Sequence, residues 1–185
     1  MRLQGKKVLI FVAQDFEDLE LHYPRIALKG EGAEVTLAGL TEEVAHGKHG
    51  VPAKPDVKVD KCRAQDFDVI VIPGGYGPDK LRTNEHVLRI VREAAQAGKP
   101  IAAICHAPWV LVSAGLCDGR RMTSWHSIKD DLINAGCEWV DEPCVVDANF
   151  ITSRMPDDLH VFCERIIEVT AGQQAQTART GQTKK

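Results

Sequence analysis

The chain has 185 residues, of which 44% are hydrophobic and 26% charged, an ordinary mixture for a globular domain. Its formal net charge of -3 gives no reason to expect nucleic acid or an anionic membrane as the main partner. No apolar run approaches the roughly 18 residues of a membrane-spanning helix, and the apolar stretch near the start is too short for a signal peptide. We therefore expect a cytoplasmic protein.

The first half of the chain alternates short β-branched runs with helical patterns. A stretch rich in glycine and proline over residues 42–60 predicts an irregular or hairpin excursion. A bend is expected in the first helix, at Pro24. The other predicted elements are strands over 6–13, 34–40, 67–72 and 99–104 and helices over 15–33, 84–98 and 107–115.

The second half continues this pattern and then loses it. We expect a helix over 126–136, a strand pair over 142–154 and an amphipathic helix over 158–172. The polar stretch over 172–185 lacks apolar periodicity, so we expect a mobile tail there. Because no repeat or linker interrupts residues 1–171, they are predicted to form one domain.

Strands that alternate with helices predict an α/β fold, in which helices cover both faces of a mostly parallel sheet. Ligands bind such sheets beyond the carboxyl ends of the strands. Three predicted strands end in chemically suggestive residues: Glu17 follows one, Gly75 another, and the pair Cys105 and His106 a third. If these strands are neighbours, a carboxylate, a glycine backbone and a thiol meet in one crevice.

Cys105 lies at the predicted junction of a strand and a helix. This position resembles a nucleophile elbow with cysteine in place of serine, and the start of the helix favours a thiolate with a lowered pKa. A buried core cysteine is the common alternative, but the turn position and the adjacent His106 favour a nucleophile. The other cysteines are interpreted as reduced structural thiols: Cys62, Cys117, Cys137, Cys144 and Cys163.

The neighbours of Cys105 each have a plain structural alternative. His106 acts as a base only if the turn folds its side chain back toward the thiol. Its backbone N–H is in addition a donor for an oxyanion. The structural alternative is a histidine that caps the helix or packs at its start. Gly75 lets the backbone approach a ligand but also suits a tight turn. Glu17, if it is held protonated beside Cys105, donates a hydrogen bond to the sulfur, although acids are also favoured in the first turn of a helix for structural reasons alone. Asp15 suits the N-cap of that helix.

Three further polar residues are weaker candidates. Asp79 follows the glycine turn and is suited to orient an imidazole, although a solvated acid at a helix start is an equal alternative. His46 and His49 have the offset of metal ligands only in a helix, which the flanking glycines oppose. No carboxylate or thiol partner for them is evident in the sequence, so we expect no metal site.

Several segments taken together resemble the PfpI family, the intracellular cysteine peptidase-like branch of the parkinsonism-associated deglycase superfamily. They follow the order of the family over nearly residues 7–170, and the combination is far more specific than any one segment. The segments are FEDLELHYP, GKHG, VIPGGYGPDKLR, AAICHAP, SAG, MTSW, IKDDLINAG, EWVDE, VVDANFITSR and PDDL.

The resemblance implies a flavodoxin-like sandwich related to class I glutamine amidotransferase domains. It implies Cys105 as nucleophile with Glu17 hydrogen-bonded to it, and the backbone N–H groups of Gly75 and His106 as an oxyanion hole. It also implies an acid from a neighbouring subunit that orients His106; the matching residue is Asp79, where such members typically carry Glu. Homodimers, some assembled into hexamers, without a metal or organic cofactor, are typical of the family.

The resemblance leaves three functions open. The leading hypothesis is a stress-response enzyme whose thiol acts on dicarbonyl or glycated substrates of the methylglyoxal type, as a deglycase or glyoxalase. The second is an intracellular cysteine peptidase. The third is a non-catalytic redox sensor or chaperone that uses an oxidisable Cys105.

Overall fold

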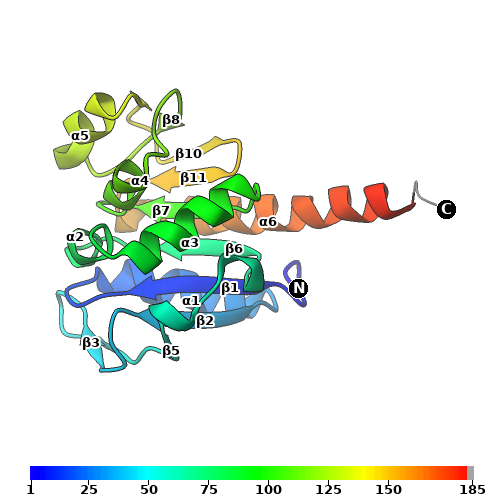
Figure 1. Ribbon diagram of the computed structural model, residues 1–185, viewed down its shortest axis with the longest axis horizontal. Helices are drawn as coiled ribbons and strands as arrows, with labels where there is room; N and C mark the ends of the chain where they lie inside the picture. Colours follow the sequence, from blue (N-terminus) through cyan, green and yellow to red (C-terminus); the bar gives the residue numbers. More distant parts are fainter. Residues whose placement is uncertain (183–185) are drawn as a thin grey trace.

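The computed structural model describes the backbone of residues 1–182 and the side chains of residues 1–172. The central sheet contains β1 (Lys7–Val12), β2 (Glu34–Gly39), β5 (Val57–Lys58), β6 (Val69–Ile72), β7 (Ile101–Ile104), β10 (Cys144–Asp147) and β11 (Phe150–Ser153). Their order across the sheet is β10-β11-β7-β6-β1-β2-β5 (Figure 1). All neighbours are parallel except β10 and β11. The predicted α/β fold with a mostly parallel sheet is confirmed.

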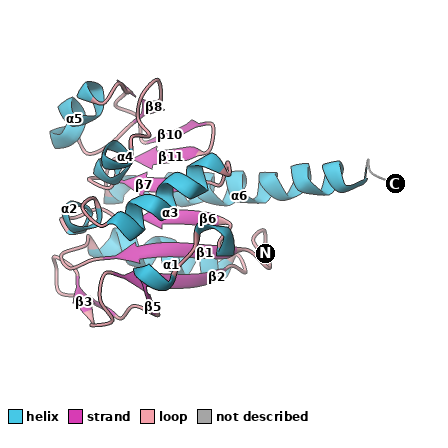
Figure 2. Ribbon diagram, viewed as in Figure 1, coloured by secondary structure: helices cyan, strands magenta, loops and turns pink. Residues whose placement is uncertain are grey.

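Helices cover both faces of this sheet (Figure 2). The helices are α1 (Asp18–Gly30), α2 (Gly77–Leu81), α3 (Glu85–Gln96), α4 (Pro108–Ala114), α5 (Lys129–Asn134) and α6 (Leu159–Gln182). Buried side chains of α1 and α6 join one apolar core, and those of α2 to α5 join the core on the opposite face. The strands between them are buried on both sides, which explains their continuous apolar runs.

The predicted excursion over residues 42–60 is a hairpin followed by the edge strand β5. Its arms are β3 (Ala45–His46) and β4 (Pro52–Ala53), which pair antiparallel. A second small sheet pairs β8 (Arg121–Met122) with β9 (Glu138–Trp139). Elements of two residues give no periodic pattern, and the sequence did not predict β5, β8 or β9 for this reason.

The helix boundaries follow local signals with one exception. The Asn84 side chain caps α3 by accepting hydrogen bonds from two backbone N–H groups, and α4 ends at Gly115, whose φ of 73° favours glycine. The N-cap expected at Asp15 is wrong, because Asp15 adopts a φ of 65° outside the helix. Glu17 caps α1 instead, and the helix continues through Pro24.

The C-terminal helix reaches further than its apolar pattern. α6 continues through Gln182, and residues 183–185 lie outside the described part of the chain. The mobile tail expected over 172–185 and the single domain over 1–171 stay predictions. Among the described residues, no helix is both long enough and apolar enough to cross a membrane.

The sheet order brings the three suggestive strand ends together. β7, β6 and β1 are consecutive neighbours and run parallel, so their carboxyl ends lie along one edge. The residues that follow them therefore meet in space, as expected from the sequence.

Candidate active site

Cys105 forms a strained turn between β7 and α4. Its φ of 64° lies in the left-handed region, which costs a residue with a Cβ about 1–2 kcal/mol. The surrounding chain holds this conformation: the Cys105 N–H donates to Ser153 O at 3.0 Å, and the Trp125 N–H donates to Cys105 O at 2.9 Å. A left-handed nucleophile between a strand and a helix is the geometry of a nucleophile elbow.

Glu20 is the carboxyl group beside this thiol. Its side chain is fully buried, and Oε2 accepts a hydrogen bond from the Gly74 N–H at 2.9 Å. Burial, followed by the charge of Glu17, raises the pKa of Glu20 to about 8, so this carboxyl keeps its proton at neutral pH. Its Oε1 atom has no hydrogen-bond partner among the described residues.

The placement of Glu17 differs from the prediction. Glu17 Oε2 accepts a hydrogen bond from the Glu20 N–H at 2.8 Å and thereby caps α1, so this oxygen serves the helix. Glu17 still lines the pocket, but the group beside the thiol is Glu20, one turn later. A sequence signal existed: Glu20, Pro24 and Leu28 are spaced by four, and all three are buried. An acid on the apolar stripe of a helix is unusual enough to single out.

The glycine turn after β6 fits closely around the thiol and the carboxyl. A Cβ on Gly74 would collide with Glu20 Oε2 and with the Cys105 side chain. Gly75 has a φ of 77°, and a Cβ there would collide with the backbone of residues 15–17. Only glycine suits both positions, because the backbone itself approaches the reactive group.

Opposing influences act on the pKa of the Cys105 thiol, and burial outweighs the others. Burial raises its pKa to about 12, with a further contribution from Glu20 once that carboxyl ionises above about pH 8, contrary to the lowered pKa expected from the helix start. Hydrogen bonds from the backbone N–H groups of Gly75 and His106 act the other way and lower it. The two donors predicted for an oxyanion hole thus both point at the sulfur.

His106 folds back onto the thiol, the condition under which it was expected to act as a base. Its Nδ1 atom lies 3.2 Å from Cys105 Sγ, and its Nε2 atom lies 3.2 Å from Ser127 Oγ. Burial, and then the charges of Lys48 and His126, lowers the pKa of His106 and keeps the ring neutral at physiological pH. Ser127, on the 3-10 turn His126–Ile128, was not predicted and has no distinctive sequence signal.

Asp79 does not reach this site within one chain. It lies exposed on α2, and among the described residues no hydrogen bond or ion pair joins it to His106. The polar partner of the imidazole in this chain is Ser127. A contact from a neighbouring subunit remains a prediction.

The pocket above the thiol has a volume of about 290 Å³. Glu17, Glu20, Cys105 and His106 contribute its polar floor, and further groups close its sides. The remaining lining residues are Lys48, Gly75, Tyr76, Trp125, Met155 and Pro156. Such a space suits a small molecule or one modified side chain.

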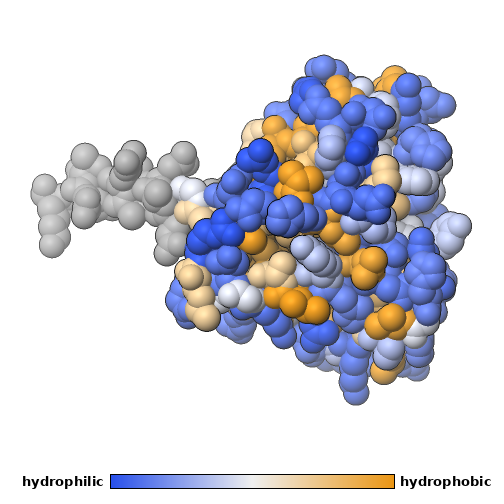
Figure 3. Space-filling view, turned by 180° about the vertical axis from the view of Figure 1, so that it is seen from behind, coloured by the Kyte–Doolittle hydropathy of each residue, from blue (hydrophilic) through white to orange (hydrophobic). Residues whose placement is uncertain are grey.

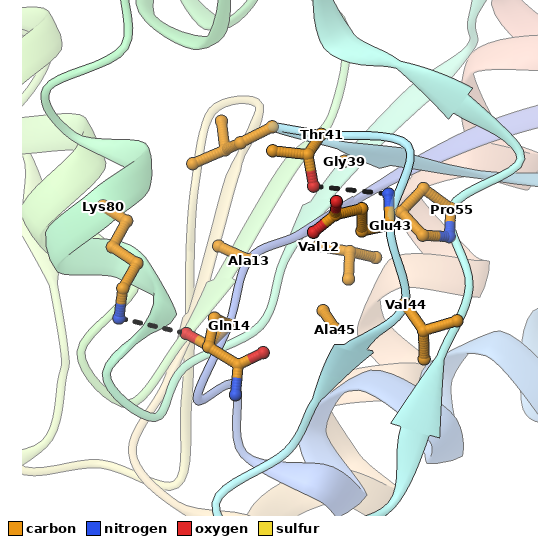
Figure 4. Close-up of a pocket in the computed structure, with 11 residues that line it drawn as sticks. Val12, Ala13, Gln14, Gly39, Thr41, Glu43, Val44, Ala45, Pro55 and Lys80 are labelled. Atoms are coloured by element: carbon orange, nitrogen blue, oxygen red, sulfur yellow. Dashed lines mark hydrogen bonds between the residues drawn. The ribbon is translucent and has the colours of Figure 1, made fainter.

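A second pocket, of about 330 Å³, lies beyond the ends of β1 and β2 (Figure 4). Backbone and small side chains line most of it, and Lys80 Nζ donates to Gln14 O at 3.4 Å on one side. No cysteine or histidine contributes to its lining. Although it is the larger of the two, its lining contains no thiol and no imidazole.

Fold and site together define a class: a flavodoxin-like α/β protein with a thiol at a strand–helix elbow, a buried acid and an adjacent imidazole. The sequence profile of the DJ-1/PfpI family matches residues 6–169. The chain therefore belongs to the DJ-1/PfpI family.

Individual relatives agree with this assignment. Deglycase PH1704 of Pyrococcus horikoshii is 46% identical over 88% of this chain and 98% of its own length. The "Putative cysteine protease YraA" of Bacillus subtilis is 40% identical over 85% of this chain and 94% of its own. Among solved structures, Drosophila melanogaster DJ-1beta is similar with a TM-score of 0.86 and 34% identity, covering 97% of this chain and 98% of that one.

Proposed function

We propose that this protein is a cofactor-independent thiol enzyme that acts on dicarbonyl or glycated substrates of the methylglyoxal type. The main observation behind this proposal is that Cys105, His106 and Glu20 line the same small pocket. Relatives named deglycase, such as PH1704, support the same chemistry.

The geometry suits addition of sulfur to an aldehyde. The Cys105 proton passes to His106 Nδ1 at 3.2 Å, and the sulfur forms a C–S bond with the aldehyde carbon. The carbonyl π electrons move to the oxygen, which takes up a proton and gives a hemithioacetal. The N–H groups of Gly75 and His106, which face the sulfur, lie close to the oxyanion that develops in this step.

Glu20 has two roles in this proposal. Its carboxyl is neutral at pH 7, so it adds no negative charge beside the sulfur as the thiolate forms. Its unpartnered Oε1 atom is available to exchange a proton with a bound substrate. Glu20 thus takes the role that was predicted for Glu17.

The test compares wild type with Cys105→Ala on methylglyoxal and on a methylglyoxal-modified thiol, with free dicarbonyl trapped separately. We expect turnover in wild type and none above background in the variant. Cys144→Ala is the matched control, since Cys144 lies on β10 outside the pocket. Equal turnover by wild type and Cys105→Ala contradicts the proposal.

A cysteine peptidase is the second candidate, supported by the name of the Bacillus subtilis relative. The same thiol and imidazole suit attack on a peptide carbonyl, but a pocket of about 290 Å³ leaves little room for a polypeptide. Cys105-dependent cleavage of peptides without dicarbonyl turnover favours this candidate. Oxidation of Cys105 by peroxide without turnover of either substrate favours a redox sensor or chaperone.

We also propose that the chain forms a homodimer through α1, and that such dimers assemble further into a hexamer. Leu19, Tyr23 and Ile26 are exposed at helical spacing on α1, and Ile26 is 71% exposed. Figure 3 shows the face that carries α1, with apolar side chains scattered among polar ones. We expect Ile26→Glu to shift the sedimentation coefficient toward that of the monomer, and an unchanged value contradicts this interface.

A cytoplasmic location is part of the proposal and agrees with six free cysteines.

A further inference from the structure

The pocket above Cys105 has an apolar lining as well as a polar floor. Four residues form this apolar lining: Tyr76, Trp125, Met155 and Pro156. Tyr76 follows β6, Trp125 follows β8, and the pair Met155 and Pro156 follows β11. Three segments that are far apart in the sequence therefore bring apolar groups to the space above one thiol, and the proposed addition of sulfur to an aldehyde uses none of them.

Tyr76 is the most exposed member of the apolar lining. This large residue is 64% exposed, although it borders the reactive groups. The centroid of its ring lies 6.3 Å from that of the His106 imidazole, and the two ring planes are inclined by 38°. Tyrosine offers a rigid, amphipathic contact surface at sites that are apolar on one side and wet on the other. Such a ring beside the catalytic imidazole is available to contact a bound molecule.

Backbone hydrogen bonds fix both aromatic residues relative to the thiol. The Trp125 N–H donates to Cys105 O at 2.9 Å, and the Tyr76 N–H donates to Asp15 O at 2.8 Å. The Trp125 ring also packs against the His126 ring, with centroids 4.4 Å apart, and against the core on the α1 side of the sheet. The aromatic groups are therefore in place before a substrate arrives, so contact with them costs little ordering.

The pocket is larger than methylglyoxal requires. Its volume of about 290 Å³ is close to the lower end of the range in which pockets hold drug-sized ligands. Methylglyoxal has only a methyl group beside its dicarbonyl unit, which fills little of this volume and leaves most of the apolar lining in contact with water. An aryl group in place of the methyl removes more apolar surface from water and adds contacts between aromatic rings, and both effects favour binding.

We propose that Tyr76 and Trp125 determine substrate specificity, and that the pocket prefers dicarbonyls in which a flat apolar group, best an aryl group, adjoins the reacting carbonyls. This inference rests on the proposed function and names the substrate class of the same site. The addition step is unchanged: Cys105 attacks the aldehyde carbon, and the aryl group lies against the apolar lining. The Tyr76 ring provides the contact, and its hydroxyl takes no part in proton transfer.

The kinetic test measures kcat/KM for phenylglyoxal and for methylglyoxal in wild type and in Tyr76→Ala. Because the two aldehydes differ in intrinsic reactivity, the informative quantity is the change in the ratio of the two values. We expect Tyr76→Ala to lower this ratio by about ten-fold or more, chiefly through a higher KM for phenylglyoxal, since even one methylene in an apolar pocket contributes roughly 10–200-fold. Tyr76→Phe should keep the wild-type ratio, because the ring is sufficient for the contact.

Val146→Ala is the control for loss of an exposed apolar side chain. Val146 lies on β10, is 42% exposed and does not line the pocket, so this variant should keep the wild-type ratio. Cys105→Ala gives the background rate for each aldehyde. An unchanged ratio in Tyr76→Ala, or an equal fall in Tyr76→Phe and Tyr76→Ala, would overturn the proposal, the second because it assigns the effect to the hydroxyl.

A binding measurement separates this inference from the proposed function. Acetophenone and acetone are ketones with and without an aryl group, and each is titrated into Cys105→Ala and followed by NMR. We expect acetophenone to bind about ten-fold or more tightly than acetone, and Cys105→Ala/Tyr76→Ala to lose most of this difference. Equal binding of the two ketones overturns the inference. Selective binding of acetophenone without turnover of either aldehyde by wild type supports it and contradicts the proposed function alone.

Discussion

The two pockets at the carboxyl edge of the sheet differ in chemistry far more than in size. One, of about 330 Å³, lies beyond β1 and β2, and the other, of about 290 Å³, lies above Cys105. The first is lined mainly by backbone and small side chains, with no thiol or imidazole. The second combines a strained cysteine, a buried acid and a neutral imidazole.

The comparison shows that volume alone does not mark a reactive site. In the Cys105 pocket, the chain accepts backbone strain at Cys105 and a desolvated carboxyl at Glu20. Both features reduce stability and are retained where chemistry needs them. The β1–β2 pocket contains neither.

The largest effect should come from removing the imidazole in the Cys105 pocket. His106→Gln is expected to lower kcat/KM for methylglyoxal by about 10²–10⁴-fold, the usual contribution of general acid–base catalysis. The control is His86→Gln, since His86 lies exposed on α3 and does not line the pocket above the thiol. Wild-type rates in His106→Gln would show that another group accepts the thiol proton.

The burial of Glu20 should make the free energy of unfolding depend on pH. Its pKa is raised from 4.5 to about 8 in the folded chain, so the native state holds a proton that the unfolded chain releases above pH 4.5. The contribution of the protonated Glu20 carboxyl to stability is therefore fully present below pH 4.5 and is lost as the pH rises through 8.

Glu20→Gln keeps the shape of the side chain without the charge. We expect it to be more stable than wild type at pH 9, by up to about 5 kcal/mol, with a much smaller difference at pH 4. Urea unfolding at both pH values measures this, with the exposed Glu43→Gln as control. The same difference at both pH values would refute the raised pKa.

A smaller effect is expected at Asp79, through the neighbouring subunit. If this carboxylate orients His106 across an interface, Asp79→Ala should lose about ten-fold or more in kcat/KM, and Asp79→Glu should keep most activity. The pH profile of kcat/KM should shift in Asp79→Ala, because an orienting acid also stabilises the charged imidazole. A fully active Asp79→Ala enzyme, or a fully active monomer, would remove this role.

The smallest effect should come from the pocket beyond β1 and β2. Val44 lines that pocket and is 43% exposed, so Val44→Ser leaves the core intact. We expect kcat/KM to change by no more than about two-fold, as for other surface substitutions. A large loss would mean that this pocket takes part in the reaction.

Much of the fold follows from local patterns. The segments that form β1, β6 and β7 are continuous apolar runs, which identify them as buried strands. Because these strands alternate with helices, they are expected to pair in parallel. The cysteine at the end of β7 could be singled out because its position between strand and helix is readable in sequence. The short strands and α2 were missed because a few residues carry no period.

The sequence alone determined the family, the α/β architecture, the nucleophile candidate and the glycine turn beside it. Only the tertiary structure decided which acid lies against the thiol, because Glu17 is the N-cap of α1 and its Oε2 turns back to the Glu20 N–H, whereas Glu20 lies inside the helix against Gly74. It also brought His49 to Glu17 and Asp18, a meeting that no spacing in the chain encodes. Local order follows from neighbours along the chain, whereas the environment of a charge is set by residues that folding brings from afar.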